Sequence, residues 1–155
     1  MHSDRLPYRL GVGIMLLNPA KQVFVGKRID TLTEAWQMPQ GGIDEGEEPV
    51  AAAVRELEEE TSVTNAVLLS QSKDWYYYDL PEHVIPNIWG GKYRGQKQRW
   101  YVFEHQGSDD DVNIQTHHPE FCEWQWANPM DLPKLIVPFK QELYQNLLVE
   151  FREWV

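Results

Sequence analysis

The sequence predicts one α+β domain in which a mixed β-sheet is covered by helices. Three observations predict this class: strand-like segments are spread along the chain, a helical pattern interrupts them after residue 48, and a second helical pattern closes the sequence. A length of 155 residues suits a single domain, residues 1–155, with its own hydrophobic core. We therefore expect one folding unit without internal repeats or a long linker.

The predicted strands are short stretches rich in β-branched and aromatic residues, bounded by turn residues. The first two strands, 8–18 and 22–28, are joined by a Pro-Ala-Lys turn, and 36–42 is an extended piece that enters a glycine turn. Further strands are predicted at 65–71, 96–105 and 121–127. Two long loops, 80–96 and 106–119, are candidates for function, because long loops in compact domains often carry it.

The first helix is predicted from about Pro49 to Thr61, because proline is favourable at the first position of a helix. At about 100° per residue, one stripe of this helix carries three acidic residues: Glu56, Glu59 and Glu60. The opposite side carries the residues that we expect to be buried: Val50, Val54, Leu57 and Thr61. Repulsion between exposed (i, i+4) carboxylates costs only a few tenths of a kcal/mol, so a plain solvated stripe is an alternative.

The second helix is predicted to begin near Pro138 and to run towards the C-terminus. Its apolar residues recur at helical spacing and form one stripe: Phe139, Leu143, Tyr144, Leu147, Leu148 and Phe151.

The charge distribution argues against some classes of partner. The formal net charge of −10 disfavours broad binding to a nucleic-acid backbone, DNA included. Much of that charge is local, because eight of the 24 acidic residues lie within 44–60.

Other features indicate a cytoplasmic protein without a membrane partner. The chain has no apolar run that could span a bilayer, and MHSDRLPYRL lacks the hydrophobic segment of a secretory signal, so we expect no such signal. Cys122 is the only cysteine, so an intramolecular disulfide is impossible.

The acidic stripe belongs to a longer pattern. From Gly41 the chain runs through five residues to Glu47, and seven residues later reads RELxEExSV over 55–63. This pattern resembles the Nudix box, the signature of the Nudix hydrolases, at every defining position except Ser62, where the family usually has glycine. A residue just past a helix end often adopts a positive φ, which glycine tolerates best. We expect Ser62 to cost a little stability without affecting the chemistry.

The resemblance implies a three-layer α/β/α sandwich with a mixed central sheet. It also implies hydrolysis of a nucleoside diphosphate linked to another moiety, with Mg²⁺ or Mn²⁺ and several ions when substrate is bound. Hard divalent cations prefer oxygen ligands, neutralise phosphate charge and acidify water. By motif matching, the metal site comprises Gly41, Glu56, Glu59, Glu60 and, from outside the box, Glu120.

The resemblance also assigns supporting roles around these ligands. Arg55 is expected to hold the rotamer of Glu59, and Glu47 is expected to brace the loop onto the helix. The backbone at Gly41 and its neighbour Gly42 approaches the metals closely. Glu120 acts as a metal ligand or as the general base, and Glu58 is expected to be simply solvated.

Segments outside the box extend the resemblance over most of the chain: WQMPQGGIDEGEEP, GQKQRWYVFE, PEFCEWQW and VPFKQELY. Together they resemble a subgroup that contains bacterial RNA pyrophosphohydrolases and asymmetric dinucleoside polyphosphate hydrolases of plant and bacterial type. The implied substrate is therefore the 5′-triphosphate end of RNA, with diadenosine tetraphosphate, split into ATP and AMP, close behind. One protein can carry both activities.

Several residues are candidates for contacts with phosphates or bases. Lys97 and Arg99 share one face of the predicted strand 96–105, and the resemblance adds candidates along the chain. The full set is Arg9, Arg28, Tyr77, Lys97, Arg99, Phe139 and Lys140. The competing interpretation is ordinary surface charge for the basic residues, and aromatic or core packing for Tyr77 and Phe139.

Three other functions stay open. A non-catalytic nucleotide-binding Nudix domain has no need of the complete glutamate set, and a sanitiser of oxidised dNTPs does not fit the matches outside the box. A calcium loop is the third, because four residues copy positions 1, 3, 5 and 12 of an EF-hand: Asp109, Asp111, Asn113 and Glu120. Ile114 stands where that loop needs glycine.

His117 and His118 shortly precede Glu120 in sequence, and we expect them to serve the loop, because histidine is a poor ligand for oxygen-loving ions. The oligomeric state is expected to be a monomer or a weak oligomer.

Overall fold

The computed structural model describes residues 5–29 and 34–155, so residues 1–4 and 30–33 of the predicted domain 1–155 lie outside it. The strands in this part of the chain are β1 (Tyr8–Leu17), β2 (Val23–Arg28), β3 (Trp36–Gln37), β4 (Gln40–Gly42), β5 (Ala66–Gln71), β6 (Tyr76–Asp79), β7 (Gly95–His105) and β8 (Phe121–Ala127). The α-helices are α1 (Pro49–Thr61), α2 (Leu132–Leu135) and α3 (Gln141–Glu150).

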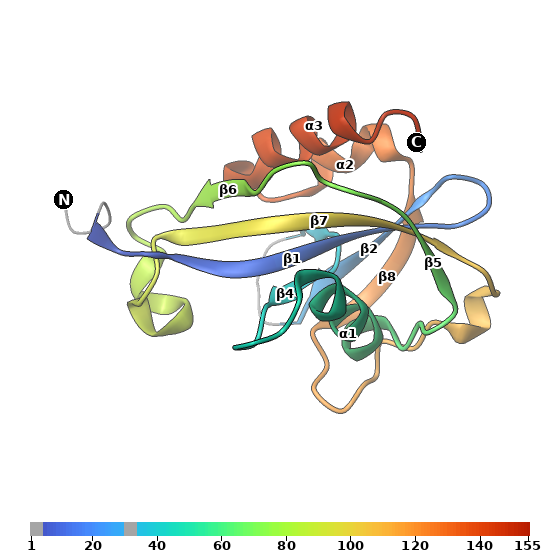
Figure 1. Cartoon of the computed structure of the whole chain (residues 1–155), viewed down its shortest axis with the longest axis horizontal. Coiled ribbons are helices and arrows are strands. Elements are labelled where there is room, and N and C mark those ends of the chain that lie inside the picture. The colour runs from blue at the N-terminus through green and yellow to red at the C-terminus, as the bar shows by residue number, and fades with distance from the viewer. Residues whose placement is uncertain (1–4, 30–33) are drawn as a thin grey trace.

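All these strands join one mixed sheet. Its order is β3-β2-β1-β7-β5, with β4 paired to β1, β6 to β7 and β8 to β2. The central pair, β1 and β7, is parallel along its full length, and the other pairs are antiparallel. Helices α2 and α3 cover one face and α1 lies on the other, which confirms the expected three-layer arrangement (Figure 1).

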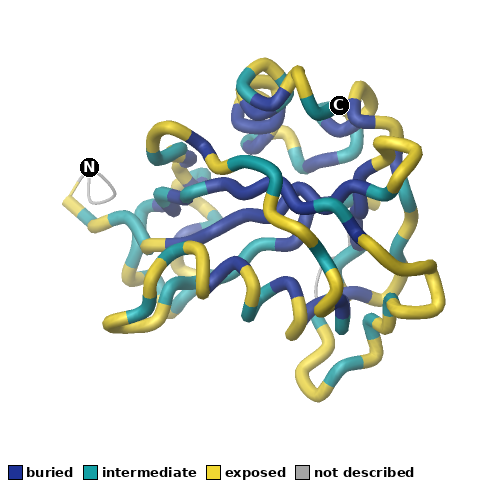
Figure 2. The backbone as a smooth tube through the Cα atoms, turned by 45° about the vertical axis from the view of Figure 1, so that its right-hand side comes forward, coloured by how far each residue is buried: buried dark blue, intermediate teal, exposed yellow. Residues whose placement is uncertain are grey.

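The alternation of side chains along the central strands builds a core on each face. Trp100 and Val102 of β7 pack with Tyr144 and Leu147 of α3, whereas Tyr101 and Phe103 belong to the core beneath α1. These side chains are almost completely buried. In Figure 2 the backbone is dark blue, the colour of buried residues, along much of the centre of the molecule. Burying one such side chain contributes about 1.5–3 kcal/mol, so the two cores fix how the helices sit on the sheet.

The predicted strands and the first helix are present, with boundaries within a few residues of expectation. Two elements were not predicted: the short helix α2 and the edge strand β6. The last helix begins three residues later than expected, because Pro138–Lys140 forms a separate 3₁₀ turn before α3. This turn places Phe139 and Lys140 outside the regular helix.

The prediction of the buried face of α1 was partly wrong. Val50 and Val54 are 38% and 50% exposed, whereas Ala52, Ala53 and Leu57 are buried. The small alanine side chains let the helix pack closely against the sheet. The resulting rotation turns the acidic stripe inwards, and Glu60, expected on the stripe opposite the core, is only 4% exposed.

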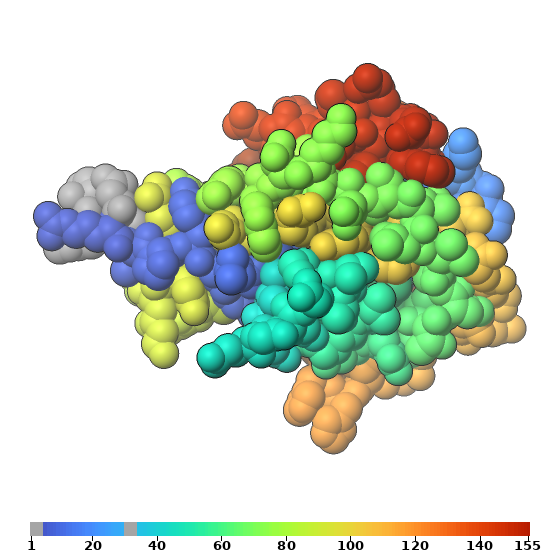
Figure 3. Space-filling view, viewed as in Figure 1, coloured from blue at the N-terminus to red at the C-terminus, as the bar shows by residue number. Residues whose placement is uncertain are grey.

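Helix α1 covers only part of its face of the sheet. Figure 3 shows side chains of β7, in yellow, at the surface between the green residues of β6 and the teal segment of β4 and α1.

Within residues 5–29 and 34–155, no helix is long and apolar enough to cross a membrane.

Ser62 ends α1 in the left-handed conformation, with φ of 68°, as the sequence predicted. Its N–H donates to the carbonyl of Glu58 at 2.8 Å, and its hydroxyl donates to the carbonyl of Asn113 at 2.8 Å. The hydroxyl thus connects the helix end to the loop before β8. This bond offsets part of the backbone strain that a non-glycine residue carries at positive φ.

We predict opposite contributions from the two features of Ser62. The Ser62→Ala protein keeps the strain and loses the hydrogen bond, so its free energy of unfolding should fall by about 1 kcal/mol. The Ser62→Gly protein loses both and should be more stable than Ser62→Ala. Urea denaturation of the three proteins measures this order, and equal stability of the two variants would show that the positive φ carries no strain.

Candidate active site

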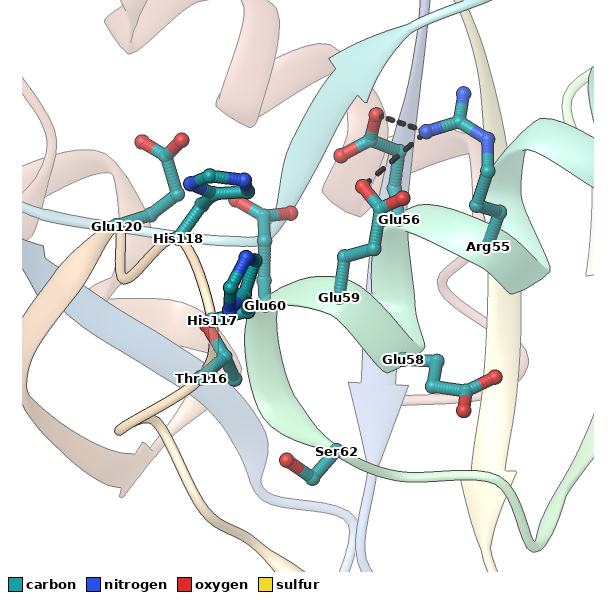
Figure 4. A pocket seen from close by; sticks show the side chains of 10 residues that line it. All are labelled: Arg55, Glu56, Glu58, Glu59, Glu60, Ser62, Thr116, His117, His118 and Glu120. Atoms are coloured by element: carbon teal, nitrogen blue, oxygen red, sulfur yellow. Dashed lines mark hydrogen bonds and ion pairs between the residues drawn. The ribbon is translucent and has the colours of Figure 1, made fainter.

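A cavity of about 670 Å³ lies between α1 and the loop that precedes β8. We call it the acidic cavity because most of its charged residues are glutamates. Figure 4 shows Glu56, Glu59 and Glu60 on the helix, Glu120 across from them, and Glu58 directed away. The lining consists of Arg55, Glu56, Glu58, Glu59, Glu60, Ser62, Thr116, His117, His118 and Glu120. The structure therefore brings together the four glutamates that the sequence singled out.

The environments of these carboxylates differ. Burial raises the pKa of Glu60 well above its ordinary value, the charges of Glu56 and Glu120 raise it further, and Arg28 opposes them. Burial likewise raises the pKa of Glu56, against the hydrogen bond from Arg55. One carboxylate oxygen of Glu60, Oε2, is buried without a hydrogen-bond partner. Such a group raises the free energy of the folded protein unless a cation compensates it.

Arg55 organises the acidic stripe. Its Nε and Nη2 each donate to the carboxylate of Glu47 at 2.9 Å, and Nη1 donates to Glu56 at 2.8 Å and to Glu59 at 3.2 Å. Glu47 in turn accepts the N–H of Asp44 at 2.9 Å, and its pKa is lowered to about 2 by the hydrogen bond from Arg55. The expected roles of Arg55 and Glu47, holding a rotamer and bracing the loop, both match these contacts.

The backbone of strand β4 lies next to the side chains of Glu56 and Arg55 on helix α1. A side chain at Gly41 would place its Cβ 2.0 Å from the carboxylate carbon of Glu56, and one at Gly42 would lie 2.3 Å from Arg9 Nη2. The Gly42 carbonyl accepts a hydrogen bond from Arg55 at 2.9 Å. Glycine at these two positions therefore leaves room for a carboxylate and an arginine beside the backbone.

The acidic cavity fits hard divalent cations. The donors are carboxylate oxygens, one of them buried and unpaired, which is the chemistry that Mg²⁺ and Mn²⁺ require. Among the described residues, no group of three histidine, cysteine, aspartate or glutamate side chains is already arranged to hold a metal ion by itself. Open donor sets of this kind suit ions that keep water and substrate phosphates among their ligands.

A second cavity of about 550 Å³ adjoins the first, and Arg28 joins the two. We call it the aromatic cavity. Arg28 lines it and approaches Glu120 to 3.4 Å, with one Nη nitrogen near a carboxylate oxygen. The lining consists of Arg28, Gln37, Gln40, Tyr78, Leu80, Val84, Asn87, Ile88, Trp89, Val137, Phe139 and Lys140. Rings and cations on one wall suit a ligand that has both a flat base and phosphates.

Lys140 lies at the base of the aromatic cavity. Its Nζ is 4.9 Å from the centre of the Tyr78 ring and 3.5 Å from Oε1 of Gln40. Burial, with a smaller contribution from the charge of Arg28, lowers the pKa of Lys140 to about 7. No carboxylate is within ion-pair distance of Lys140 in the described part of the chain, so an anionic ligand is the charge that would restore its proton.

The predicted substrate residues fall into two groups. Arg28, Phe139 and Lys140 line the aromatic cavity, and Arg9 stacks on Trp89 at its rim, 5.0 Å from the ring centre. The structure places the other three, Tyr77, Lys97 and Arg99, outside both cavities.

Sequence analysis missed several residues of the aromatic cavity, of which Tyr78 is the clearest. It lies one residue beyond Tyr77, so it points to the opposite face of β6. The signal was the alternation within WYYYD, but β6 was not recognised as a strand. Gln37 and Gln40 were also missed, because glutamine in an extended segment has no distinctive pattern.

The calcium-loop hypothesis finds no support in the side-chain directions. Asp109 accepts a hydrogen bond from Trp126, whereas Asp111 accepts one from Asn65 and caps its own 3₁₀ turn. Glu120 lies in the acidic cavity instead. His117 and His118 contact each other, with ring centres 4.5 Å apart, at the outer wall of that cavity.

The acidic cavity suits divalent cations, and an arginine links it to a cationic and aromatic cavity. Together they suit a protein that acts on a ligand with a flat base and several phosphates. The chain belongs to the Nudix family, because the family description "NUDIX domain" matches residues 7–147.

Relatives with curated names cover nearly the whole chain. A protein named RNA pyrophosphohydrolase from Sphingopyxis alaskensis is 52% identical over 150 residues, which are 96% of this chain and 95% of the relative. One of the same name from Rickettsia rickettsii is 50% identical over 154 residues, 99% of this chain and 95% of the relative.

Solved structures share the fold at low identity. The Escherichia coli dihydroneopterin triphosphate pyrophosphohydrolase superimposes with a TM-score of 0.68 and 16% identity over 92% of this chain and 98% of that one. A binary complex of the Caenorhabditis elegans Ap4A hydrolase superimposes with a TM-score of 0.65 and 18% identity, over 92% of this chain and 98% of that one.

We predict that Glu60→Gln stabilises the metal-free protein at neutral and alkaline pH. A carboxyl whose folded pKa is raised binds its proton more tightly when folded, so stability falls as pH rises from about 4.5 through the folded pKa. The variant removes this loss, so its melting temperature should exceed that of the wild type at pH 8 and match it near pH 4. Added Mg²⁺ should raise the melting temperature of the wild type more than that of the variant.

Thermal melts in a chelator at the two pH values, repeated with Mg²⁺, test this expectation. Glu58→Gln is the matched control, because Glu58 is exposed and points away from the cavity. A Glu60→Gln protein that is less stable than the wild type at pH 8 in the chelator would contradict the assignment of Glu60 as an uncompensated buried charge in the metal-free protein.

Proposed function

We propose that this Nudix chain is a Mg²⁺- or Mn²⁺-dependent hydrolase of phosphoanhydride bonds, with the 5′-triphosphate end of RNA as its main substrate. The observation that carries the proposal is the buried carboxylate of Glu60, one oxygen of which has no hydrogen-bond partner, among three further glutamates and next to a cavity with rings and cations. When bound, the divalent cations neutralise phosphate charge and acidify water. Glu56, Glu59, Glu60 and Glu120, with the backbone at Gly41, hold them.

Other residues of the chain position the carboxylates, neutralise the phosphates and bind the base. Arg55 fixes the carboxylates of Glu56 and Glu59 through hydrogen bonds, so they do not have to be ordered when substrate arrives. Arg28, between the two cavities, neutralises phosphate oxygens at the point where the chain of phosphates passes from one to the other. Phe139 and Tyr78 offer ring faces to a base, and Lys140 offers a proton donor to phosphate. Glu120 is a ligand or the general base.

The choice of substrate rests on relatives that match along almost their full length. Those named above at 50–52% identity are RNA pyrophosphohydrolases. An enzyme that grips only a 5′ end needs few phosphate contacts, so the net charge of −10 is compatible with this substrate. A cytoplasmic location, where such RNA ends occur, is part of the proposal.

Diadenosine tetraphosphate is the second candidate substrate. It also presents several phosphates next to a base, and the aromatic cavity can accept that combination as well.

Hydrolysis of both substrates with Mg²⁺, Mn²⁺ or a chelator tests the proposal. We expect metal-dependent release of pyrophosphate or phosphate from triphosphorylated RNA at a higher kcat/KM than release of ATP from diadenosine tetraphosphate. Heavy-oxygen water identifies the phosphorus that is attacked, because the label enters the product formed there. Tight nucleotide binding without turnover would instead identify a binding-only domain.

We predict that Glu59→Gln loses most of its turnover but remains folded. Glu59 is largely exposed, so the fold does not depend on its charge. Loss of a charge that contributes about 3 kcal/mol to the transition state lowers kcat about 100-fold. The control is Glu58→Gln on the adjacent turn, which should keep turnover within about twofold of the wild type. Initial rates at saturating Mg²⁺ measure both, and near-normal turnover of Glu59→Gln would remove it from the metal site.

The pKa of about 7 at Lys140 predicts a pH-dependent affinity for the substrate. The free protein loses the lysine proton as pH rises through 7, so kcat/KM should acquire a descending limb there. Lys140→Arg keeps a charge at all these pH values, because arginine does not deprotonate in proteins. The ratio of kcat/KM for the wild type to that for Lys140→Arg should therefore decline between pH 6 and about 8. A ratio that is flat over this range would show that Lys140 stays charged.

A further inference from the structure

The edge strand β6 carries aromatic rings on both of its faces. Tyr76 and Tyr78 pair with the buried Gln98 and Gln96 of β7, whereas Tyr77 pairs with Lys97 on the side of the sheet where α1 lies. Tyr77 is 54% exposed. The strand is also the outer neighbour of β7, and it pairs with no further strand within the described residues.

A third cavity, of about 430 Å³, lies at this edge. We call it the tyrosine cavity. Its lining consists of Tyr8, Tyr76, Tyr77, Tyr78, Asp79, Phe139, Glu142, Leu143 and Asn146. Tyr78 and Phe139 also line the aromatic cavity, so these two rings form a common wall between the two spaces. A chain that leaves the aromatic cavity can therefore pass over this wall to the edge of the sheet.

On the other side of β6, cations and rings alternate on the part of the sheet that α1 leaves uncovered. Lys97 Nζ lies 5.1 Å and Arg99 Cζ 5.7 Å from the ring centre of Trp75. The ring of Tyr77 packs edge-on against Tyr8, with centres 5.0 Å apart. We call Trp75, Tyr77, Lys97 and Arg99 the cation–aromatic surface.

The charges of this surface are available to a ligand. Among the described residues, neither Lys97 nor Arg99 forms an ion pair with a carboxylate, and Arg99 donates only to the carbonyl of Ser72, at 3.1 Å. One acid at this edge, Asp79, is already paired with Arg94 at 3.1 Å and accepts the hydroxyl hydrogen of Tyr8. A cationic surface on a chain of net charge −10 is complementary to an anionic partner.

We propose that the tyrosine cavity and the cation–aromatic surface form a track that binds single-stranded RNA downstream of its 5′ end. The inference rests on the proposed function, and it extends the site beyond the two cavities that hold the 5′ end. Rings stack on bases whatever their sequence, and each stacked base contributes about 1–3 kcal/mol in proteins that bind single strands. Lys97 and Arg99 neutralise backbone phosphates, while Glu142 and Asn146 offer hydrogen-bonding groups to bases and ribose hydroxyls.

The track gives a new interpretation of Lys97, Arg99 and Tyr77. From sequence, Lys97 and Arg99 were candidates for contacts with the polyphosphate, and Tyr77 for a contact with a phosphate or a base. All three lie outside the cavities where the polyphosphate would bind. A track predicts that their contribution grows with the length of the RNA. Direct contacts with the polyphosphate predict the same contribution for every substrate.

Three substrates separate these possibilities: diadenosine tetraphosphate, a 5′-triphosphorylated dinucleotide, and an RNA of about 12 nucleotides with the same first two residues. The test protein is the double variant Lys97→Ala/Arg99→Ala. We expect its kcat/KM to fall about tenfold or more on the long RNA, and by a smaller factor on the two short substrates. The dependence of log kcat/KM on log salt should become shallower by about 1.4 for the long RNA alone, because two phosphate contacts are lost.

Two further variants control this result. Lys134→Ala/Arg152→Ala removes the same charge from exposed positions on α2 and after α3, and it should leave the ratio between long and short substrates unchanged. Tyr77→Ala removes an exposed ring without changing charge, and it should lower kcat/KM for the long RNA selectively, without altering the salt dependence.

Specific outcomes overturn the track. If kcat/KM of the double variant falls equally on all three substrates, Lys97 and Arg99 contact the polyphosphate and the track is wrong. If kcat/KM falls on none of them, the surface does not bind RNA during the reaction. Self-association of the wild type that the double variant abolishes, measured by sedimentation, would make the surface an interface between two copies. The proposed function has a separate readout: it fails if the wild type itself releases no phosphate from triphosphorylated RNA, whatever the variants do.

Discussion

Repulsion among carboxylates that the fold holds close together is the constraint on which the site depends. Glu56 and Glu60 have raised pKa values because packing against the sheet removes them from water. The charge of Glu56 raises the pKa of Glu60 further, and the charge of Glu59 raises that of Glu56. Arg55 compensates only part of this charge, since it contacts Glu56 and Glu59 but not Glu60. The fold thus keeps a local excess of negative charge, which hard cations relieve more completely than any side chain present.

The sheet distributes the parts of the site through the alternation of its strands. Side chains that point towards α3 build the aromatic cavity, whereas those that point towards α1 build the cation–aromatic surface. Parallel pairing of β1 with β7 aligns these two faces over ten residues of each strand. Because β6 ends the sheet, a flexible ligand can contact both faces by passing around one edge.

Sequence reasoning could predict the acidic cavity because its residues are close in sequence and follow a helical period. The loop brace from Glu47 to Arg55 and the positive φ at Ser62 were predictable for the same reason. The rotation of α1 was not, because close packing of Ala52 and Ala53 against the sheet decided it, and the valines gave the stronger hydrophobic signal. Sequence reasoning selected Tyr77, whereas Tyr78 lines the aromatic cavity. Which tyrosine faces the cavity depends on the pairing of β6 with β7, a contact between segments distant in sequence.

The most direct test of the account is anomalous diffraction from crystals soaked with Mn²⁺ and a non-hydrolysable nucleotide polyphosphate. The account predicts anomalous peaks in the acidic cavity, within ligand distance of carboxylate oxygens of Glu56, Glu59 or Glu60, with phosphate oxygens completing the coordination. Phosphates bound in the aromatic cavity with no anomalous peak beside those carboxylates would contradict it. In that case the excess negative charge on α1 would have no cation to compensate it, and the proposed chemistry would have no site.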